Sequence, residues 1–235
     1  MTPSLLNGNL VPVHVLSVSS FKGGVGKTTV TLGLASAAFS KGLRTLVIDL
    51  DPQSDVSTGL GVRPGTSGSV ADVLAHPKLK VVRSAIAPSG WTMPNHAPID
   101  VMVGSPSAIN FDGPHPTTRE IWKLEEALAT IEADYDLVLI DCPPSFNALT
   151  RTAWAASDRV LVVTEPGLFS VAAADRALRA IEEVRKAAAS DEIKTSWANS
   201  GAEFPNLTGA QFGSFVSGEI KKWAAVVKAS GAKLD

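Results

Sequence analysis

The chain has 235 residues, a mass of 24.5 kDa and a formal net charge of −2, so it offers no overall positive field for nucleic acid. A single cysteine, Cys142, excludes an internal disulfide and a metal site of four cysteines. No apolar run approaches the length of a membrane span, and residues 1–13 lack the basic and apolar regions of a signal peptide. We therefore expect a cytoplasmic protein with no membrane partner.

The first predicted elements are a strand, a glycine loop and a helix. Residues 1–12 show no regular pattern, and the apolar residues 13–19 predict a strand. Residues 29–40 have the pattern of a helix, which Gly42 stops. Between them lies F-K-G-G-V-G-K-T-T at 21–29. A glycine loop between a strand and a helix N-terminus lets backbone N–H groups and the helix dipole bind phosphates, although a chance glycine turn is the alternative.

Within this loop, the spacing assigns roles to two side chains. Lys27 is placed to reach the β- and γ-phosphates of a nucleotide, and the Thr28 hydroxyl is placed to hold Mg²⁺. We therefore expect ATP and Mg²⁺ as ligands. The predicted nucleotide-binding residues are Lys22, Gly23, Gly24, Val25, Gly26, Lys27, Thr28 and Thr29.

The second predicted strand, at 44–50, carries carboxylates at its end. The run R-T-L-V-I-D-L does not alternate, which is typical of a parallel strand covered on both faces. Asp49 and Asp51 lie at its carboxyl end, where open α/β sheets place their ligand-binding groups. A capping or turn role for Asp51, just before Pro52, is the alternative.

The middle of the chain is less regular. Residues 69–75 predict a short helix, residues 88–98 are rich in turn formers, and residues 99–103 predict a strand. Thr117 and Glu120 form a capping box that predicts the start of a helix running to about residue 133.

The last clear elements complete an α/β pattern. The strand predicted at 136–140 ends in Asp141, as a Walker B strand does, and a further buried strand is predicted at 158–164. A helix is expected at 170–188. Repeated strand–helix alternation predicts a doubly wound, mostly parallel sheet of the P-loop NTPase type, cut short on its C-terminal side.

Five motifs resemble those of the ParA/MinD partition ATPases over about residues 13–185. They are K-G-G-V-G-K-T-T at 22–29, D-L-D-P-Q at 49–53, S-T-G-L-G at 57–61, D-C-P-P-S at 141–145 and L-T at 149–150. The first resembles the deviant Walker A box of that family, with the extra lysine at Lys22. Phe21 departs from the family pattern, because a polar residue is usual there.

The resemblance implies roles for individual residues. Lys22 would reach across a dimer interface to the phosphates of the other subunit, and Asp51 would position the attacking water. Asp49 and Asp141 would act in the second shell of Mg²⁺ with Thr28 at the ion. The segment 141–145 would sense the γ-phosphate.

The C-terminal part departs from that family. Residues 191–235 resemble the tail of Bug-type solute-binding proteins of tripartite tricarboxylate transporters, through G-A-E at 201–203, Q-F-G-S-F-V at 211–216 and the run at 219–235. This divides the expected organisation into an incomplete ATPase domain at 1–189 and a helical tail at 190–235. The tail is either a fusion artefact or an acquired amphipathic helix that covers the open edge of the sheet.

The leading functional hypothesis is a partition ATPase. By resemblance, ATP and Mg²⁺ close a sandwich homodimer, and a ParB-like centromere-binding protein stimulates hydrolysis. Non-specific DNA binding, with nucleoid association, is in doubt because the family's DNA-contacting helices are replaced. The alternatives are a MinD-like membrane-cycling ATPase and an inactive nucleotide-binding remnant.

Overall fold

The computed structural model describes residues 5–6, 9–10, 14–63, 68–94, 96–165, 176 and 178–184. All of these belong to the first of two compact units, Met1–Ala187. The predicted tail at 190–235 lies outside the described residues. Most of the helix predicted at 170–188 also lies outside them, and residues 176 and 178–184 are helical.

A six-stranded sheet forms the centre of this unit, in the order β5-β6-β4-β7-β3-β8. Every neighbouring pair is parallel except β5 with β6, which is antiparallel. The predicted mostly parallel sheet is therefore confirmed. The strands are β3 (His14–Ser19), β4 (Thr45–Asp49), β5 (Ile86–Pro88), β6 (Asp100–Met102), β7 (Leu137–Asp141) and β8 (Arg159–Val162).

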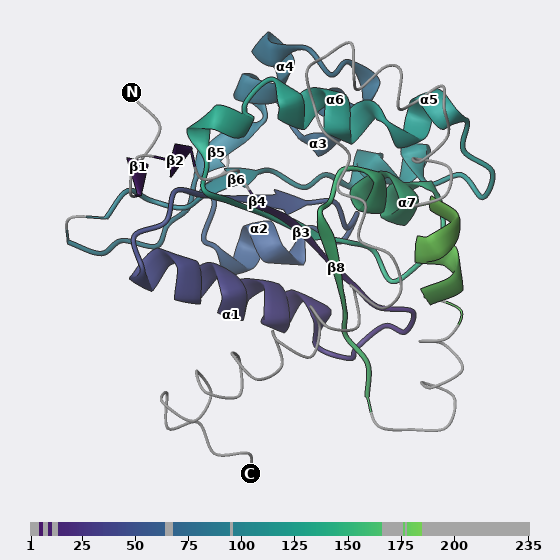
Figure 1. Ribbon diagram of the computed structural model, residues 1–235, viewed down its shortest axis with the longest axis horizontal. Helices are drawn as coiled ribbons and strands as arrows, with labels where there is room; N and C mark the ends of the chain where they lie inside the picture. The colour runs from purple at the N-terminus through teal and green to yellow at the C-terminus, as the bar shows by residue number, and fades with distance from the viewer. Residues whose placement is uncertain are drawn as a thin grey trace. The chain divides into compact units, whose positions relative to one another are not determined.

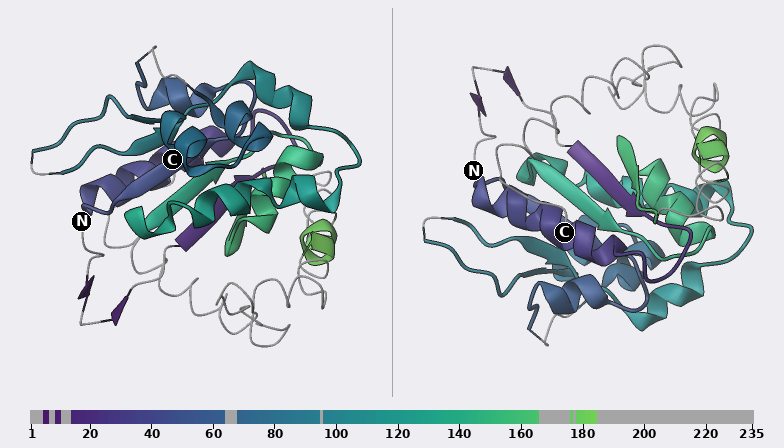
Figure 2. Two further views of the ribbon diagram at one scale, coloured as in Figure 1. Left: turned by 90° about the horizontal axis from the view of Figure 1, so that it is seen from above. Right: turned by 90° about the horizontal axis from the view of Figure 1, so that it is seen from below.

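Helices cover both faces of the sheet (Figure 1). On one face lie α1 (Lys27–Ser40) and α2 (Asp55–Gly59), and the view from below in Figure 2 shows α1 lying along the strands. The other face carries α3 (Val70–Ala75), α4 (Leu79–Ser84), α5 (Thr118–Ile121), α6 (Lys123–Ala129) and α7 (Ala148–Ala155). Two 3₁₀ helices, η1 (Pro106–Phe111) and η2 (Glu132–Asp134), complete the set.

Alternate residues of the central strands enter two separate cores. On β4, Val47 joins the core beneath α1, whereas Leu46 and Ile48 join the core beneath α3 to α7. On β7, Leu139 and Ile140 divide in the same way. Both faces are thus buried, which explains why these strands do not alternate between apolar and polar residues. Each fully buried leucine or isoleucine contributes about 1.5–3 kcal/mol.

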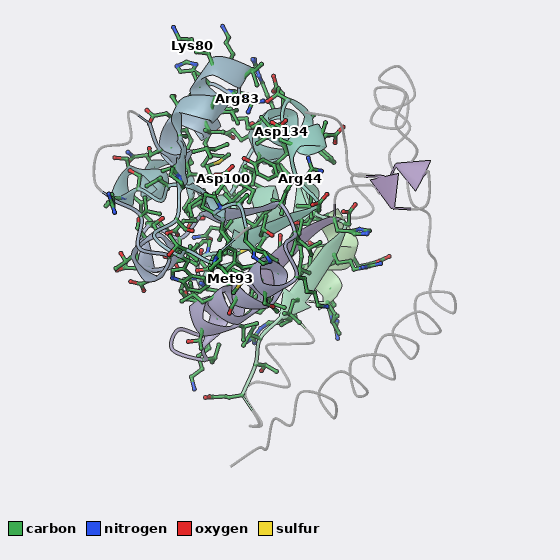
Figure 3. All side chains as sticks on the ribbon, turned by 90° about the vertical axis from the view of Figure 1, so that its left-hand side faces the viewer. Arg44, Lys80, Arg83, Met93, Asp100 and Asp134 are labelled. Atoms are coloured by element: carbon green, nitrogen blue, oxygen red, sulfur yellow. The ribbon has the colours of Figure 1, made fainter. Side chains whose placement is uncertain are left out.

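Charged and polar pairs tie together the amino ends of the strands, at the opposite edge from Asp49 and Asp141. Figure 3 labels several of these side chains. The pairs are Arg44 Nη2 with Asp136 Oδ1 at 2.7 Å, Arg83 Nη2 with Asp134 Oδ2 at 2.6 Å, and Tyr135 Oη with Asp100 Oδ2 at 2.9 Å. They fasten the sheet at this end and leave the carboxyl ends of the strands for a site.

Four sequence expectations needed correction or extension. The strand predicted as buried at 158–164 is β8, whose residues are half-buried or exposed, because β3 is its only paired neighbour among the described strands. The helix predicted from Thr117 to about residue 133 is divided at Trp122 into α5 and α6, and η2 follows. The leader contains two short strands, β1 (Leu5–Leu6) and β2 (Asn9–Leu10), which pair antiparallel. The elements α2, α4, α7, β5 and η1 were not predicted. Among the described helices, none combines the length and apolar character that a membrane span requires.

Candidate nucleotide-binding site

The loop between β3 and α1 has a backbone that requires glycine. Gly24 and Gly26 have φ values of 78° and 87°, in the left-handed region that glycine adopts without strain. Gly26 is the N-cap of α1, and no side-chain hydrogen bond caps this helix. A Cβ atom at Gly23, Gly24 or Gly26 would meet no described atom within 4 Å. The loop therefore presents the uncapped N-terminus of a 14-residue helix to open space, which is a favourable arrangement for an anion.

Lys27, the first residue of α1, turns its ammonium group toward two carboxylates. The side chain is 7% exposed, and Nζ lies 3.1 Å from Asp141 Oδ2 and 3.4 Å from Asp51 Oδ2. A cation buried to this degree needs such partners, because removing an unpaired ammonium group from water costs roughly several kcal/mol. Lys27 is therefore held at the site by the two acids.

Asp141 collects most of the contacts at the end of β7. Its Oδ2 also accepts from Thr28 Oγ1 at 2.9 Å, and its Oδ1 accepts from Thr31 Oγ1 at 2.8 Å. Burial raises the pKa of this fully buried carboxyl, while Lys27 and the threonines act in the opposite direction. Thr31 was not predicted. Its position one helical turn after Lys27 and Thr28 is a sequence signal that could have identified it.

Asp49 lies beside Asp141, because the two residues are register partners on the parallel strands β4 and β7. Its Oδ2 accepts from the Ser57 backbone N–H at 2.8 Å. Its Oδ1 is buried and has no hydrogen-bond partner among the described residues. Burial is the main cause that raises the pKa of Asp49 to about 7, with smaller contributions from the charges of Asp141 and Asp51. The site therefore contains an unused buried acceptor, which is costly unless a ligand or water serves it.

Gly104 completes the surroundings of Asp49. A Cβ atom there would lie 2.7 Å from Asp49 Cγ and 2.7 Å from Ser54 Oγ, closer than such contacts occur. The Gly104 N–H donates to Ser57 Oγ at 3.0 Å, and Ser57 in turn holds Asp49. Neither Ser57 nor Gly104 was predicted as a site residue, since only the folded chain brings β6 against the start of α2.

Asp51 makes contacts through both of its carboxylate oxygens. Its Oδ1 accepts from the Gln53 backbone N–H at 3.0 Å, as a turn carboxylate does, and its Oδ2 faces Lys27. It is largely buried. The turn bond fixes the orientation of the carboxylate.

Lys22 lies apart from these acids. Its side chain is 63% exposed, and its ammonium group contacts the carboxylate of Glu165, just after β8. The structure therefore does not bring Lys22 to Lys27, Asp51 or Asp141 within one chain.

Aromatic side chains join the loop to the segment after β7. The Phe21 ring lies 5.9 Å from Phe146 and 6.1 Å from Trp154, and the latter two lie 5.4 Å apart, measured between centroids. Trp154 Nε1 donates to Ser19 Oγ at 2.8 Å. The unusual Phe21 thus has a packing role.

Cys142 lies beside Asp141 and is fully buried. Burial raises the pKa of its thiol to about 12.

This arrangement defines a P-loop protein, with a glycine loop, a lysine and a threonine at a helix N-terminus facing an aspartate at the end of a neighbouring strand. A family model described as an AAA domain matches residues 13–195. The chain therefore belongs to this AAA-domain family.

Comparisons with individual proteins agree with the motifs. The chromosome partitioning protein ParA of Caulobacter vibrioides (strain NA1000 / CB15N) is 38% identical over 181 residues, covering 74% of this chain. The chain spans 64% of the length of that relative. The cobyrinic acid a,c-diamide synthase of Mycobacterium smegmatis, crystallised with ADP and magnesium, superposes with a TM-score of 0.65 at 27% identity and covers 74% of this chain and 69% of its own. A plasmid partition protein of Borrelia burgdorferi has the same fold, with a TM-score of 0.63 at 22% identity and coverage of 73% and 74%.

Proposed function

We propose that this chain binds ATP together with Mg²⁺ and hydrolyses it as the ATPase of a ParA-type partition system. The observation that carries the proposal is the placement of Lys27 and Thr28, in the first turn of α1, against the buried Asp141. The partition role is supported by the similarity to the Caulobacter ParA protein. The use of a nucleotide is supported by the ADP-bound and magnesium-bound state of the Mycobacterium smegmatis synthase.

The loop and Lys27 suit a triphosphate. Backbone N–H groups at the start of α1 would bind phosphate oxygens, and the helix dipole would favour their charge. Lys27 would exchange its contact with Asp51, the longer of its two at 3.4 Å, for the β- and γ-phosphates. This exchange leaves Asp51 free to accept a hydrogen bond from water.

The residues present also suit Mg²⁺. In the described part of the chain, no three His, Cys, Asp or Glu side chains are grouped to hold a metal. A hard cation at Thr28 would therefore take most of its ligands from phosphate and water, as Mg²⁺ usually does. The buried acceptor Oδ1 of Asp49 and the carboxylate of Asp141 would receive hydrogen bonds from such waters. When bound, Mg²⁺ supplies positive charge that offsets the charge of the phosphates.

Asp51 and Lys22 have the remaining roles in the proposal. Asp51, oriented by the Gln53 N–H, would position the attacking water. Lys22 would leave Glu165 and reach the phosphates bound by a second copy of the chain, which is consistent with its exposure of 63%. The homodimer on ATP and stimulation by a ParB-like protein belong to this proposal.

Phosphate release from the full chain tests it. The wild-type protein should hydrolyse ATP with Mg²⁺ and not with EDTA, and Lys27→Ala, purified in parallel, should show no turnover. Equal turnover by both proteins would identify a contaminating ATPase. Failure of the wild type to bind ATP with Mg²⁺ would overturn the proposal.

The same protein preparations distinguish the ParA-type role from the MinD-like membrane-cycling alternative. Turnover and co-sedimentation should be measured with duplex DNA and with vesicles of anionic phospholipid. Binding of the ATP-loaded protein to DNA, or to neither DNA nor vesicles, supports the ParA-type role. ATP-dependent flotation with vesicles would favour the MinD-like alternative.

A further inference from the structure

Asp112, in the loop after η1, holds the chain that follows β7. Its Oδ2 accepts from Ser145 Oγ at 3.0 Å and from Asn147 Nδ2 at 3.3 Å, and its Oδ1 accepts from the Leu149 N–H at 3.1 Å. One carboxylate therefore fastens three residues that are more than thirty positions away in the sequence. The start of the chain between β7 and α7 is held separately, through Asp141, by Lys27 and Thr28.

The contact with Leu149 replaces a cap that α7 lacks. Asn147 is the N-cap of α7, and its own side chain makes no capping hydrogen bond. Asn147 instead donates its amide to Asp112, which accepts the free N–H of Leu149 in the first turn. A negative charge at a helix N-terminus is favourable, so Asp112 caps α7 from a distant part of the chain.

The contacts of Asp112 with Ser145 and Asn147 hold the segment between β7 and α7. Ser145 lies within the segment 141–145, and its carbonyl oxygen accepts from Thr150 Oγ1 at 2.7 Å. The next residue, Phe146, packs against Phe21 of the phosphate loop. The Ala148 N–H donates to the Gly113 carbonyl at 3.0 Å, which adds a backbone contact beside Asp112. The position of residues 143–147 relative to the loop is thus set from the η1 side.

We propose that Asp112 is a positioning residue for ATP hydrolysis, which holds the segment 141–145 in register with the phosphate loop. The inference rests on the proposed function, in which that segment senses the γ-phosphate. Asp112 acts through Ser145 and Asn147, and among the described residues it makes no hydrogen bond to Lys27, Thr28 or Asp51. Its loss should therefore change the rate of hydrolysis more than the affinity for nucleotide.

Steady-state kinetics of the full-length protein tests this, with ADP affinity and thermal unfolding measured on the same samples. Asp112→Ala should lower kcat by about tenfold or more, because small displacements of reacting groups have large effects on rate. KM for ATP and the affinity for ADP should stay within about twofold, since the loop, Lys27 and Thr28 are untouched. The control is Glu120→Ala, which removes from α5 an exposed capping carboxylate that accepts hydrogen bonds from Thr117. That variant should keep the wild-type kcat.

A double-mutant cycle distinguishes positioning from loss of the helix cap. Ser145→Ala removes a segment contact and leaves the Leu149 contact in place, so it should lower kcat in the same direction as Asp112→Ala. If Asp112 acts through Ser145, the double variant should lose less than the product of the two single effects. Should Asp112→Ala fail to fold, the pair Ser145→Ala and Asn147→Ala removes the same two contacts from the other side and must then lower kcat.

The outcomes are separable from failure of the proposed function. No Mg²⁺-dependent turnover by the wild type overturns the function itself. If the wild type is active but Asp112→Ala keeps the wild-type kcat, or loses no more than Glu120→Ala does, the positioning role alone is overturned.

Discussion

Lys27 and Asp141 form a buried ion pair at the centre of the candidate site, with Nζ 3.1 Å from Oδ2. The lysine comes from the first turn of α1 and the aspartate from the last residue of β7. The pair joins the phosphate loop to the sheet. A ligand that draws Lys27 toward itself therefore also changes the surroundings of Asp141.

Lys27→Ala should abolish nucleotide binding, because the loop loses the charge that meets the β- and γ-phosphates. It should also lower the free energy of unfolding by about 3–5 kcal/mol, the usual effect of leaving a buried charge without its partner. Binding of a fluorescent ATP analogue and denaturant unfolding measure the two effects. The variant Lys27→Ala/Asp141→Asn should regain much of the stability and none of the binding. Recovery of binding would show that Lys27 is not a phosphate ligand.

Lys22→Ala should behave differently, since Lys22 is exposed and pairs only with Glu165 in the described interactions. The free energy of unfolding should change by less than about 1 kcal/mol, as for most surface ion pairs. ATP binding by the monomer should persist, while dimerisation and turnover should be lost. Equal loss of ATP binding in Lys22→Ala and Lys27→Ala would show that Lys22 acts within its own chain.

Asp51→Ala should bind ATP and accumulate as a dimer, because only the positioning of water is removed. Size-exclusion chromatography with ATP and Mg²⁺ detects the dimer, and phosphate release measures the loss of turnover. Monomeric elution together with unchanged turnover would contradict the role of Asp51.

Gly104→Ala should disturb Asp49, since the added methyl group would lie 2.7 Å from Asp49 Cγ. We expect a loss of about 1–3 kcal/mol in the free energy of unfolding, typical of overpacking, and weaker Mg²⁺-dependent ATP binding. The control is Gly33→Ala on α1, where a Cβ atom meets no described atom within 4 Å. That change should stabilise the helix by up to about 1 kcal/mol. Similar behaviour of the two variants would contradict the packing around Asp49.

Asp49→Asn should change how stability depends on pH. The folded protein raises the pKa of Asp49 to about 7, and the unfolded value is about 3.9, so the folded state binds the extra proton between these values. The wild type should therefore lose stability as pH rises from about 4 to about 7, by up to about 4 kcal/mol from this group. The asparagine variant lacks this loss, so its advantage should grow across that window and stay constant above it. Thermal unfolding in EDTA measures the difference, and parallel curves would contradict the raised pKa.

Much of the fold follows from local sequence. The strands at 13–19, 44–50 and 136–140 are short runs of apolar residues, and the lack of alternation at 44–50 correctly indicated burial on both faces. The capping box of Thr117 and Glu120 formed as predicted. The break at Trp122 and the antiparallel β5 did not follow from local pattern, because tertiary packing decides both.

The candidate site shows the same division. Lys27, Thr28, Asp49, Asp51 and Asp141 were identified from motifs, and the structure places them together. Their supporting residues were missed for a physical reason. Thr31, Ser57, Gly104 and Asp112 act through contacts between distant parts of the chain, and a single sequence does not show which segments meet.

Cys142 gives the protein a practical property. Its thiol is fully buried, and its pKa of about 12 keeps it protonated at neutral pH, so thiolate chemistry is suppressed. Because the chain has no other cysteine, a cysteine introduced at an exposed position would react with maleimide dyes almost alone. Distances between two such dyes on two copies of the chain would then follow assembly in real time, without first removing the native residue beside Asp141.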